Sequence, residues 1–155
     1  DAQRATEIRR MKARVDSERL PRGADPATHT KLGRGGLADV EWTIQLLQLQ
    51  HAHRVAALRT PVTAPALRAA ADAGLLDPAD AAALLAAWRL ASRTRNALTL
   101  VRGKPVDQLP SSGRELAKVA RVLGRSADDD PGEVVDEYRR ITRRARAVVE
   151  RSFGT

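Results

Sequence analysis

The residues that could support chemistry are concentrated in one glycine-rich stretch, residues 31–41, which leads into an apolar segment. It reads Lys-Leu-Gly-Arg-Gly-Gly-Leu-Ala-Asp-Val-Glu. Glycines let a backbone approach a partner closely, and the first turn of a helix presents amide groups that attract phosphate or carboxylate. Lys31 and Arg34 add positive charge nearby. The stretch is therefore a candidate loop for a phosphate or a partner domain, and a loop packed only for structural reasons is the equal alternative.

Two carboxylates, Asp39 and Glu41, follow the glycines in what we expect to be the first turn of a helix. Negative side chains at that place offset the helix dipole and satisfy free amides, so capping alone is one explanation for them. Positions two apart on a helix point in different directions, so this pair cannot easily share a metal ion. We predict no metal centre here.

Other familiar catalytic patterns are missing. The chain has no cysteine, which excludes disulfides, thiolate zinc sites and cysteine nucleophiles. Gly33, Gly35 and Ala38 formally match a dinucleotide fingerprint, but no apolar strand precedes them, and the Walker A pattern fails as well. His51 and His53 lie two apart without a His-Glu-x-x-His arrangement, and no Gly-x-Ser-x-Gly elbow occurs. Independent catalytic activity is not predicted.

The charge balance leaves a choice of partners open. A net charge of +8 suggests an acidic partner, although an arginine- and alanine-rich composition is also typical of GC-rich bacterial genomes. The arginines of residues 139–146 form either a surface for an acidic partner or a solvated helix face. The scarcity of aromatics weakens the case for nucleic acid, and we expect Trp42 and Trp88 to be buried. A basic nucleic-acid-binding or protein-interaction module remains the alternative reading.

Composition and periodicity predict an all-α fold, a helical bundle of about six helices. Alanine, leucine and arginine favour helices, and β-branched and aromatic residues are sparse. We treat residues 1–155 as one domain with a first helix (1–20), a Gly/Pro-rich loop (21–36) and the remaining helices (37–155). Proline and glycine positions divide that remainder into helices at about 37–57, 64–73, 77–101, 116–123 and 134–152.

Apolar spacing predicts which helix faces are buried. Asp77 is a predicted N-cap before Pro78, and Gly74 a predicted left-handed C-cap. The predicted buried positions are Ile8, Met11 and Val15 in the first helix; Leu37, Val40, Ile44, Leu46, Leu47 and Leu49 in the second; and Val134, Tyr138, Ile141, Ala145, Val148 and Ser152 along the last.

The segment from Lys31 to Trp42 resembles the signature Lys-x-x-x-Gly-Gly-(Leu/Ile)-x-Asp-(Ile/Val)-Glu-(Phe/Trp) of glutamine synthetase adenylyltransferases. Upstream, Arg10, Met11 and Arg14 resemble that family as well, as does the Arg-x-Pro-Arg-Gly stretch at 19–23. In the family a nucleotidyltransferase domain is followed by a helical bundle of the kind found in uridylyltransferases for the signalling protein PII. The resemblance implies that this chain is such a bundle.

The resemblance also implies an activity that this chain does not carry alone. The parent enzyme attaches AMP from ATP to a tyrosine of glutamine synthetase, and removes it, with Mg²⁺ held mainly by the nucleotidyltransferase domain. The Gly-Ser motif and the metal-binding carboxylates of that domain do not occur here, so we expect this chain to be inactive by itself and to hold no cofactor. The stretch at 49–53 and the ending after 148–153 look more like the C-terminal, AMP-attaching half.

By the same resemblance, the glycine-rich motif faces the adjoining catalytic domain and shapes its nucleotide cleft. The expected partners are that upstream domain, glutamine synthetase and, as a further candidate, PII. The chain starts at Asp1 without Met or signal peptide and has no long apolar run, so we expect a piece of a longer cytoplasmic protein with no membrane contact. The expected contact residues are Lys31, Arg34, Gly35, Gly36, Asp39 and Glu41.

Overall fold

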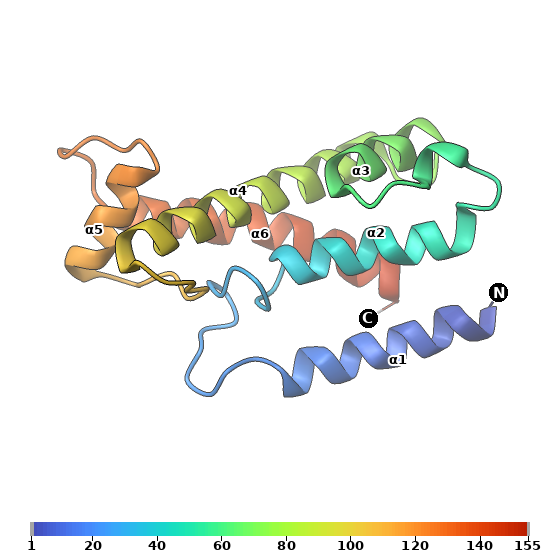
Figure 1. The fold of residues 1–155 in the computed structure, drawn as a ribbon, viewed down its shortest axis with the longest axis horizontal. Coiled ribbons are helices and arrows are strands. Elements are labelled where there is room, and N and C mark those ends of the chain that lie inside the picture. The colour runs from blue at the N-terminus through green and yellow to red at the C-terminus, as the bar shows by residue number, and fades with distance from the viewer. Residues whose placement is uncertain (1, 155) are drawn as a thin grey trace.

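The computed structural model describes residues 2–154, and within them the regular structure is helical throughout. This confirms the predicted all-α bundle (Figure 1). A single 3-10 turn, η1 (Ala56–Leu58), accompanies the α-helices. The α-helices are α1 (Ala2–Glu18), α2 (Leu37–His51), α3 (Thr63–Asp72), α4 (Pro78–Arg102), α5 (Gly113–Val122) and α6 (Gly132–Phe153).

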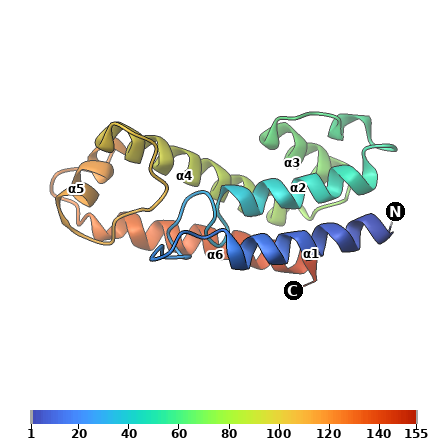
Figure 2. The ribbon, with the colours of Figure 1, turned by 60° about the horizontal axis from the view of Figure 1, so that its bottom comes forward.

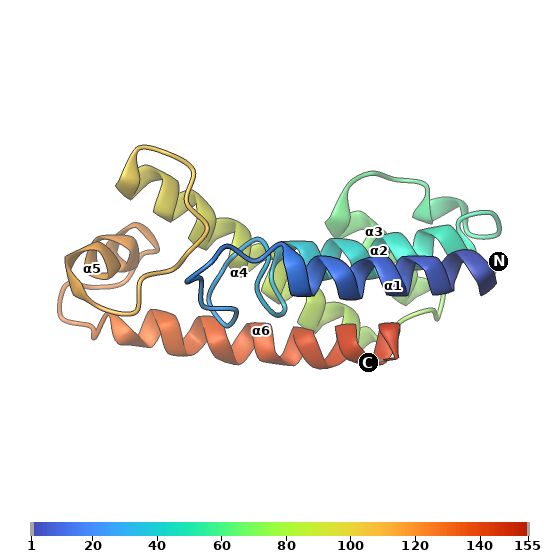
Figure 3. The ribbon, with the colours of Figure 1, turned by 90° about the horizontal axis from the view of Figure 1, so that it is seen from below.

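Two long helices, α4 and α6, pack side by side and run through most of the elongated molecule. At one end α5 packs against α4, and at the other α2 and α3 cover α4. Helix α1 lies at the edge of the bundle, alongside α2 and α6, as the turned views show (Figures 2 and 3). The loop between α1 and α2 therefore lies near the middle of the bundle, against α6.

Local sequence signals set several helix ends as predicted. The Asp77 carboxylate accepts a hydrogen bond from the Ala79 amide at 2.8 Å, with Pro78 beginning α4. Such a cap satisfies an amide that would otherwise lack an intrahelical partner. Gly74 has a φ of +71°, which confirms the left-handed residue predicted after α3.

The second helix is shorter than predicted. Helix α2 ends at His51, and the chain turns back through η1 instead of continuing to residue 57. The Gln48 amide donates to the carbonyls of Leu58 and Thr60, and the Leu58 side chain is fully buried. A continuing helix would have carried Leu58 away from the core, so tertiary packing overrides the helical pattern there.

The buried side chains form two clusters. One contains Val40, Ile44 and Leu84 and lies among α2, α3, α4 and α6; the other lies among α4, α5 and α6. The predicted face of α6 is confirmed at Val134, Tyr138, Ala145 and Val148, with Ile141 and Ser152 half-buried. Two predicted burial positions are wrong, because Met11 is 55% exposed and Leu49 is 60% exposed.

The loop before α2 is tied to the loop between α4 and α5. The Thr30 amide donates to the Asp107 carbonyl at 2.6 Å, and the Leu109 amide donates to the Thr28 carbonyl at 3.1 Å. A single antiparallel bridge joins His29 to Gln108 between these bonds. This pairing fixes the glycine-rich loop over the middle of the bundle.

Candidate functional site

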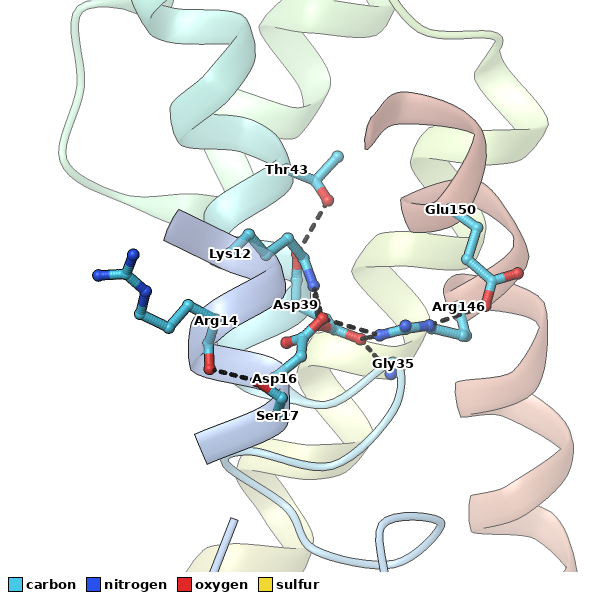
Figure 4. Close-up of polar contacts among 9 residues, drawn as sticks. All are labelled: Lys12, Arg14, Asp16, Ser17, Gly35, Asp39, Thr43, Arg146 and Glu150. Carbon is cyan, nitrogen blue, oxygen red and sulfur yellow. Dashed lines mark hydrogen bonds and ion pairs between the residues drawn. The ribbon is translucent and has the colours of Figure 1, made fainter. Parts of the chain in front are cut away.

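Asp39, the first carboxylate of the glycine-rich motif, lies inside the bundle. Its Oδ1 accepts from Lys12 Nζ at 2.8 Å, and its Oδ2 accepts from Arg146 Nη1 at 2.9 Å and from the Gly35 amide at 2.7 Å (Figure 4). Asp39 and Lys12 are each only 4% exposed. We call Lys12, Asp39 and Arg146 the buried ion network; it joins α1, α2 and α6.

Two further carboxylates support the cations of the buried ion network. Asp16 Oδ2 lies 2.7 Å from Lys12 Nζ and 3.7 Å from Arg146 Nη1, and Glu150 Oε1 accepts from Arg146 Nε at 3.0 Å. Burial acts to lower the pKa of Arg146, but the neighbouring carboxylates, Asp39 first, outweigh it and raise that pKa. The Arg146 guanidinium is therefore held in its charged form.

Lys12 is also the main anchor of α1. Only Ala5 and Lys12 of this helix are buried, and the Lys12 ammonium lies 5.3 Å from the centre of the Phe153 ring. A cation over an aromatic face gains some electrostatic stabilisation. The attachment of α1 to the bundle thus depends strongly on a charged side chain.

The motif's glycines are needed for close internal packing. Gly35 has a φ of +69°, and a Cβ added there would collide with the Thr142 carbonyl of α6. A Cβ on Gly36 would lie 2.6 Å from the Thr30 carbonyl oxygen, and one on Gly33 would collide with the His29 carbonyl. Only residues without a Cβ let the loop fold on itself and touch α6 this closely.

The amide groups of the loop are mostly used within the chain. Gly33 donates to the His29 carbonyl at 2.9 Å, and Arg34 donates to the Pro26 carbonyl at 2.8 Å. At the start of α2, Leu37 donates to Thr30 and Ala38 to Lys31, each at 2.9 Å. An anion at this loop would therefore depend on side chains rather than on these amides.

His29 also acts as a structural acceptor. Its Nδ1 accepts from the Leu32 amide at 2.9 Å, and the residue is 6% exposed. Burial lowers the pKa of His29, and the charge of Lys31 lowers it further, while Asp107 opposes the shift. The neutral imidazole is thus the form that fits this loop.

The remaining motif side chains reach the surface. Lys31 and Arg34 are exposed and Glu41 is half-buried. Among residues 2–154, none of these three forms a salt bridge. The structure therefore divides the six predicted contact residues into an inner group, Gly35, Gly36 and Asp39, and an outer group, Lys31, Arg34 and Glu41.

Sequence reasoning missed Lys12 and Arg146, which lie 27 and 107 residues from Asp39 along the chain. A weak signal existed for Lys12, because it follows Ala5 and Ile8 at helical spacing on the face that becomes buried. No local signal marked Arg146, which we had grouped with the other arginines of α6.

The described residues show no group of three or more His, Asp or Glu side chains placed to hold a metal ion. The Asp39 carboxylate is paired with Lys12 and Arg146, so it does not fit a magnesium site. Trp42 and Trp88 are half-buried and pack against the core clusters. Between residues 2 and 154, no helix combines the length and apolar character needed to cross a bilayer.

Comparisons with known proteins agree with the family resemblance that the glycine-rich motif indicates. The family model described as GlnD PII-uridylyltransferase matches residues 9–153. The chain is 64% identical over 149 residues to the bifunctional glutamine synthetase adenylyltransferase/adenylyl-removing enzyme of Nocardia farcinica (strain IFM 10152). It is 63% identical to the proteins of the same name from Mycobacterium avium (strain 104), over 150 residues, and Streptomyces avermitilis, over 147 residues.

These alignments cover 95–96% of the chain but only 15% of each relative. They confirm the resemblance drawn from the glycine-rich motif. The chain spans about 15% of the length of the curated relatives it matches.

Proposed function

This chain belongs to the family described as GlnD PII-uridylyltransferase, and from its relatives we propose that it serves as the helical accessory domain of a bifunctional glutamine synthetase adenylyltransferase/adenylyl-removing enzyme. The parent enzyme is a nucleotidyltransferase that uses ATP and Mg²⁺ and acts in the cytoplasm. Its catalytic carboxylates belong to a nucleotidyltransferase domain upstream of this chain. The chain itself contributes structure and contacts, and it is inactive alone.

The proposal rests on the division of the glycine-rich motif into an inner, buried group and an outer group at the surface. Its inner residues brace the loop against α6 through Gly35 and the buried ion network. Its outer side chains, Lys31, Arg34 and Glu41, have no salt bridge within residues 2–154 and lie on the glycine-rich loop or near the start of α2. A surface held this firmly, with unpaired charges of both signs, suits contact with an adjoining domain.

In this proposal the outer group meets the nucleotidyltransferase domain beside its nucleotide cleft, while the inner group acts as positioning residues. Glutamine synthetase is the substrate of the assembled enzyme, with a tyrosine as the AMP acceptor. The AMP-attaching half is the parent half we favour, and PII is a candidate regulator of the complete enzyme.

The proposal can be tested in the full-length enzyme by replacing Lys31 and Glu41 together with alanine. We expect the kcat/KM for adenylylation of glutamine synthetase to fall about tenfold or more, as is common when domain positioning is disturbed. The melting temperature should change little, because neither side chain has a salt bridge in the described residues.

A matched control replaces Lys118 and Asp136, an exposed charge pair on α5 and α6 that also lacks salt bridges in the described part of the chain. Full activity in the control and a loss in the motif variant support the contact. Equal activity in both variants, with both enzymes stably folded, would contradict it.

A further inference from the structure

A cavity of about 160 Å³ opens between the glycine-rich loop and α6. A neighbouring cavity of about 390 Å³, toward α1, shares the side chains of Arg34 and Arg146. The smaller cavity thus lies directly outside the buried ion network. Its lining consists of Ala27, Arg34, Arg139, Thr142, Arg143 and Arg146.

The helical repeat explains why so many guanidinium groups meet here. Arg139, Arg143 and Arg146 follow one another by four and three residues, so they lie on one face of α6. Arg34 joins them from the loop, which Gly35 brings against the Thr142 carbonyl. Four arginines therefore line a cavity whose wall also includes a large share of apolar surface, Ala27 among it.

The chain's own carboxylates satisfy these arginines only in part. Arg146 is paired through its Nε and Nη1 with Glu150, Asp39 and Asp16. Arg139 makes one contact, with Asp25 at 3.3 Å.

The remaining donors lack partners. Arg139 Nε is buried and has no hydrogen-bond partner within the described chain. Arg34 and Arg143 form no salt bridge to any residue between 2 and 154. A buried unpaired donor and two unpaired cations around one cavity favour an anion that accepts several hydrogen bonds.

We infer that this arginine cavity binds a phosphate group, either as free inorganic phosphate or as part of the phosphate chain of a nucleotide. Arginine is suited to this role because its planar fork donates two parallel hydrogen bonds to neighbouring oxygens. A cavity of about 160 Å³ equals roughly five water volumes, which suits one tetrahedral oxyanion. This inference rests on the geometry of the chain and does not depend on the proposed function.

The cavity is distinct from a phosphate site built on backbone amides. The amides of Gly33, Arg34, Leu37 and Ala38 donate to carbonyls of the chain, so recognition falls to the guanidinium groups. Binding should accordingly be sensitive to single arginine substitutions and to ionic strength.

The test is isothermal titration of the full chain, at constant ionic strength, with inorganic phosphate, ATP and malonate in turn. We expect saturable binding of phosphate or of ATP, and Arg34→Ala and Arg143→Ala should each weaken it about tenfold or more, the usual effect of losing a charge-assisted hydrogen bond. Arg143→Lys should recover only part of the affinity, because an ammonium group cannot donate in a fork.

Arg144→Ala is the matched control, an exposed arginine on α6 that is absent from the cavity lining. Stronger binding of phosphate than of ATP identifies free phosphate as the ligand, and the reverse identifies a nucleotide. Binding of neither, tighter binding of malonate, or an equal loss in Arg144→Ala would overturn the inference. Melting temperatures of the variants without ligand show that they remain folded, since Arg34 and Arg143 support no salt bridge in the described chain.

Discussion

Where α5 packs against α4, the interior is mainly aliphatic and contains Leu98, Leu116 and Val119. Where α1 meets α2 and α6, the interior contains Lys12 and Asp39, both almost completely buried. The first region gains stability from the transfer of apolar surface out of water, roughly in proportion to the area that is buried. The second region depends on buried charges that stabilise the fold only while each one keeps its partner, because an unpaired buried charge is costly.

The difference bears on function because the candidate surface lies beside the ionic region. A buried ion network offers limited net stability compared with apolar packing of similar volume, but it fixes the relative positions of its partners. Here the partners are α1, α2 and α6, together with the loop that carries Lys31 and Arg34. The apolar end supports the bundle, and the ionic region fixes the loop.

The largest effect is expected from Asp39→Asn, which preserves the shape of the side chain but leaves two cations without their shared carboxylate. Breaking a buried ion pair costs about 3–5 kcal/mol, so the free energy of unfolding should fall by that amount in denaturant titrations. Asp16→Asn, at the exposed edge of the network, is the control and should cost less than about 1 kcal/mol. Similar losses in both variants would mean that Asp39 has no special place in the network.

A slightly smaller loss is expected from Gly35→Ala, about 3–4 kcal/mol, because it adds a steric collision to an unfavourable backbone conformation. Gly103 provides a control with the same φ of +69° but with open space around the added Cβ. Gly103→Ala should cost only about 1–2 kcal/mol, so the difference measures the contact between the loop and α6. Equal costs in denaturant titrations would show that the loop relaxes away from Thr142 freely.

At the apolar end, Leu98→Ala should cost about 3 kcal/mol by lost burial and an unfilled cavity. Leu100→Ala, on the same helix and 74% exposed, should have almost no effect. Added sodium chloride screens charges, so it should change the stability penalty of Asp39→Asn more than that of Leu98→Ala. The opposite result would remove the distinction between the two regions.

A smaller effect is expected from pH through His29. Its pKa is lowered on folding, so the unfolded chain binds more protons below the ordinary value of 6.5, and stability should fall as the pH drops through that region. His29→Asn keeps an acceptor near the Leu32 amide and should reduce this dependence in thermal unfolding from about pH 8 to about pH 5. An unchanged pH dependence in His29→Asn would show that this imidazole does not contribute to it.

The smallest effect is expected from Tyr138→Phe in the apolar region. The Tyr138 hydroxyl is buried without a hydrogen-bond partner in the described residues, and burial, with the Asp107 charge, raises its pKa. Removing an unsatisfied hydroxyl should leave the free energy of unfolding unchanged or raise it by up to about 1 kcal/mol. A clear loss of stability would indicate a partner for this hydroxyl and a more polar interior at that end.

The amino-acid sequence determined the helical class, most helix boundaries and the buried face of α6. Those features depend on helix propensity, on caps such as Asp77 and on the periodicity of residues near one another along the chain. The motif at Lys31–Trp42 also indicated the family, which the comparisons confirmed.

Only the tertiary structure decided what the motif's residues touch. Asp39 has a predictable place in the first turn of α2, but its partners Lys12 and Arg146 lie far away along the chain, and packing brings them together. The same holds for the end of α2, where burial of Leu58 overrides a helical pattern, and for Arg34 and Arg143, which meet at one cavity. Local periodicity sets which face of a helix is apolar, whereas charges buried between helices depend on how those helices meet.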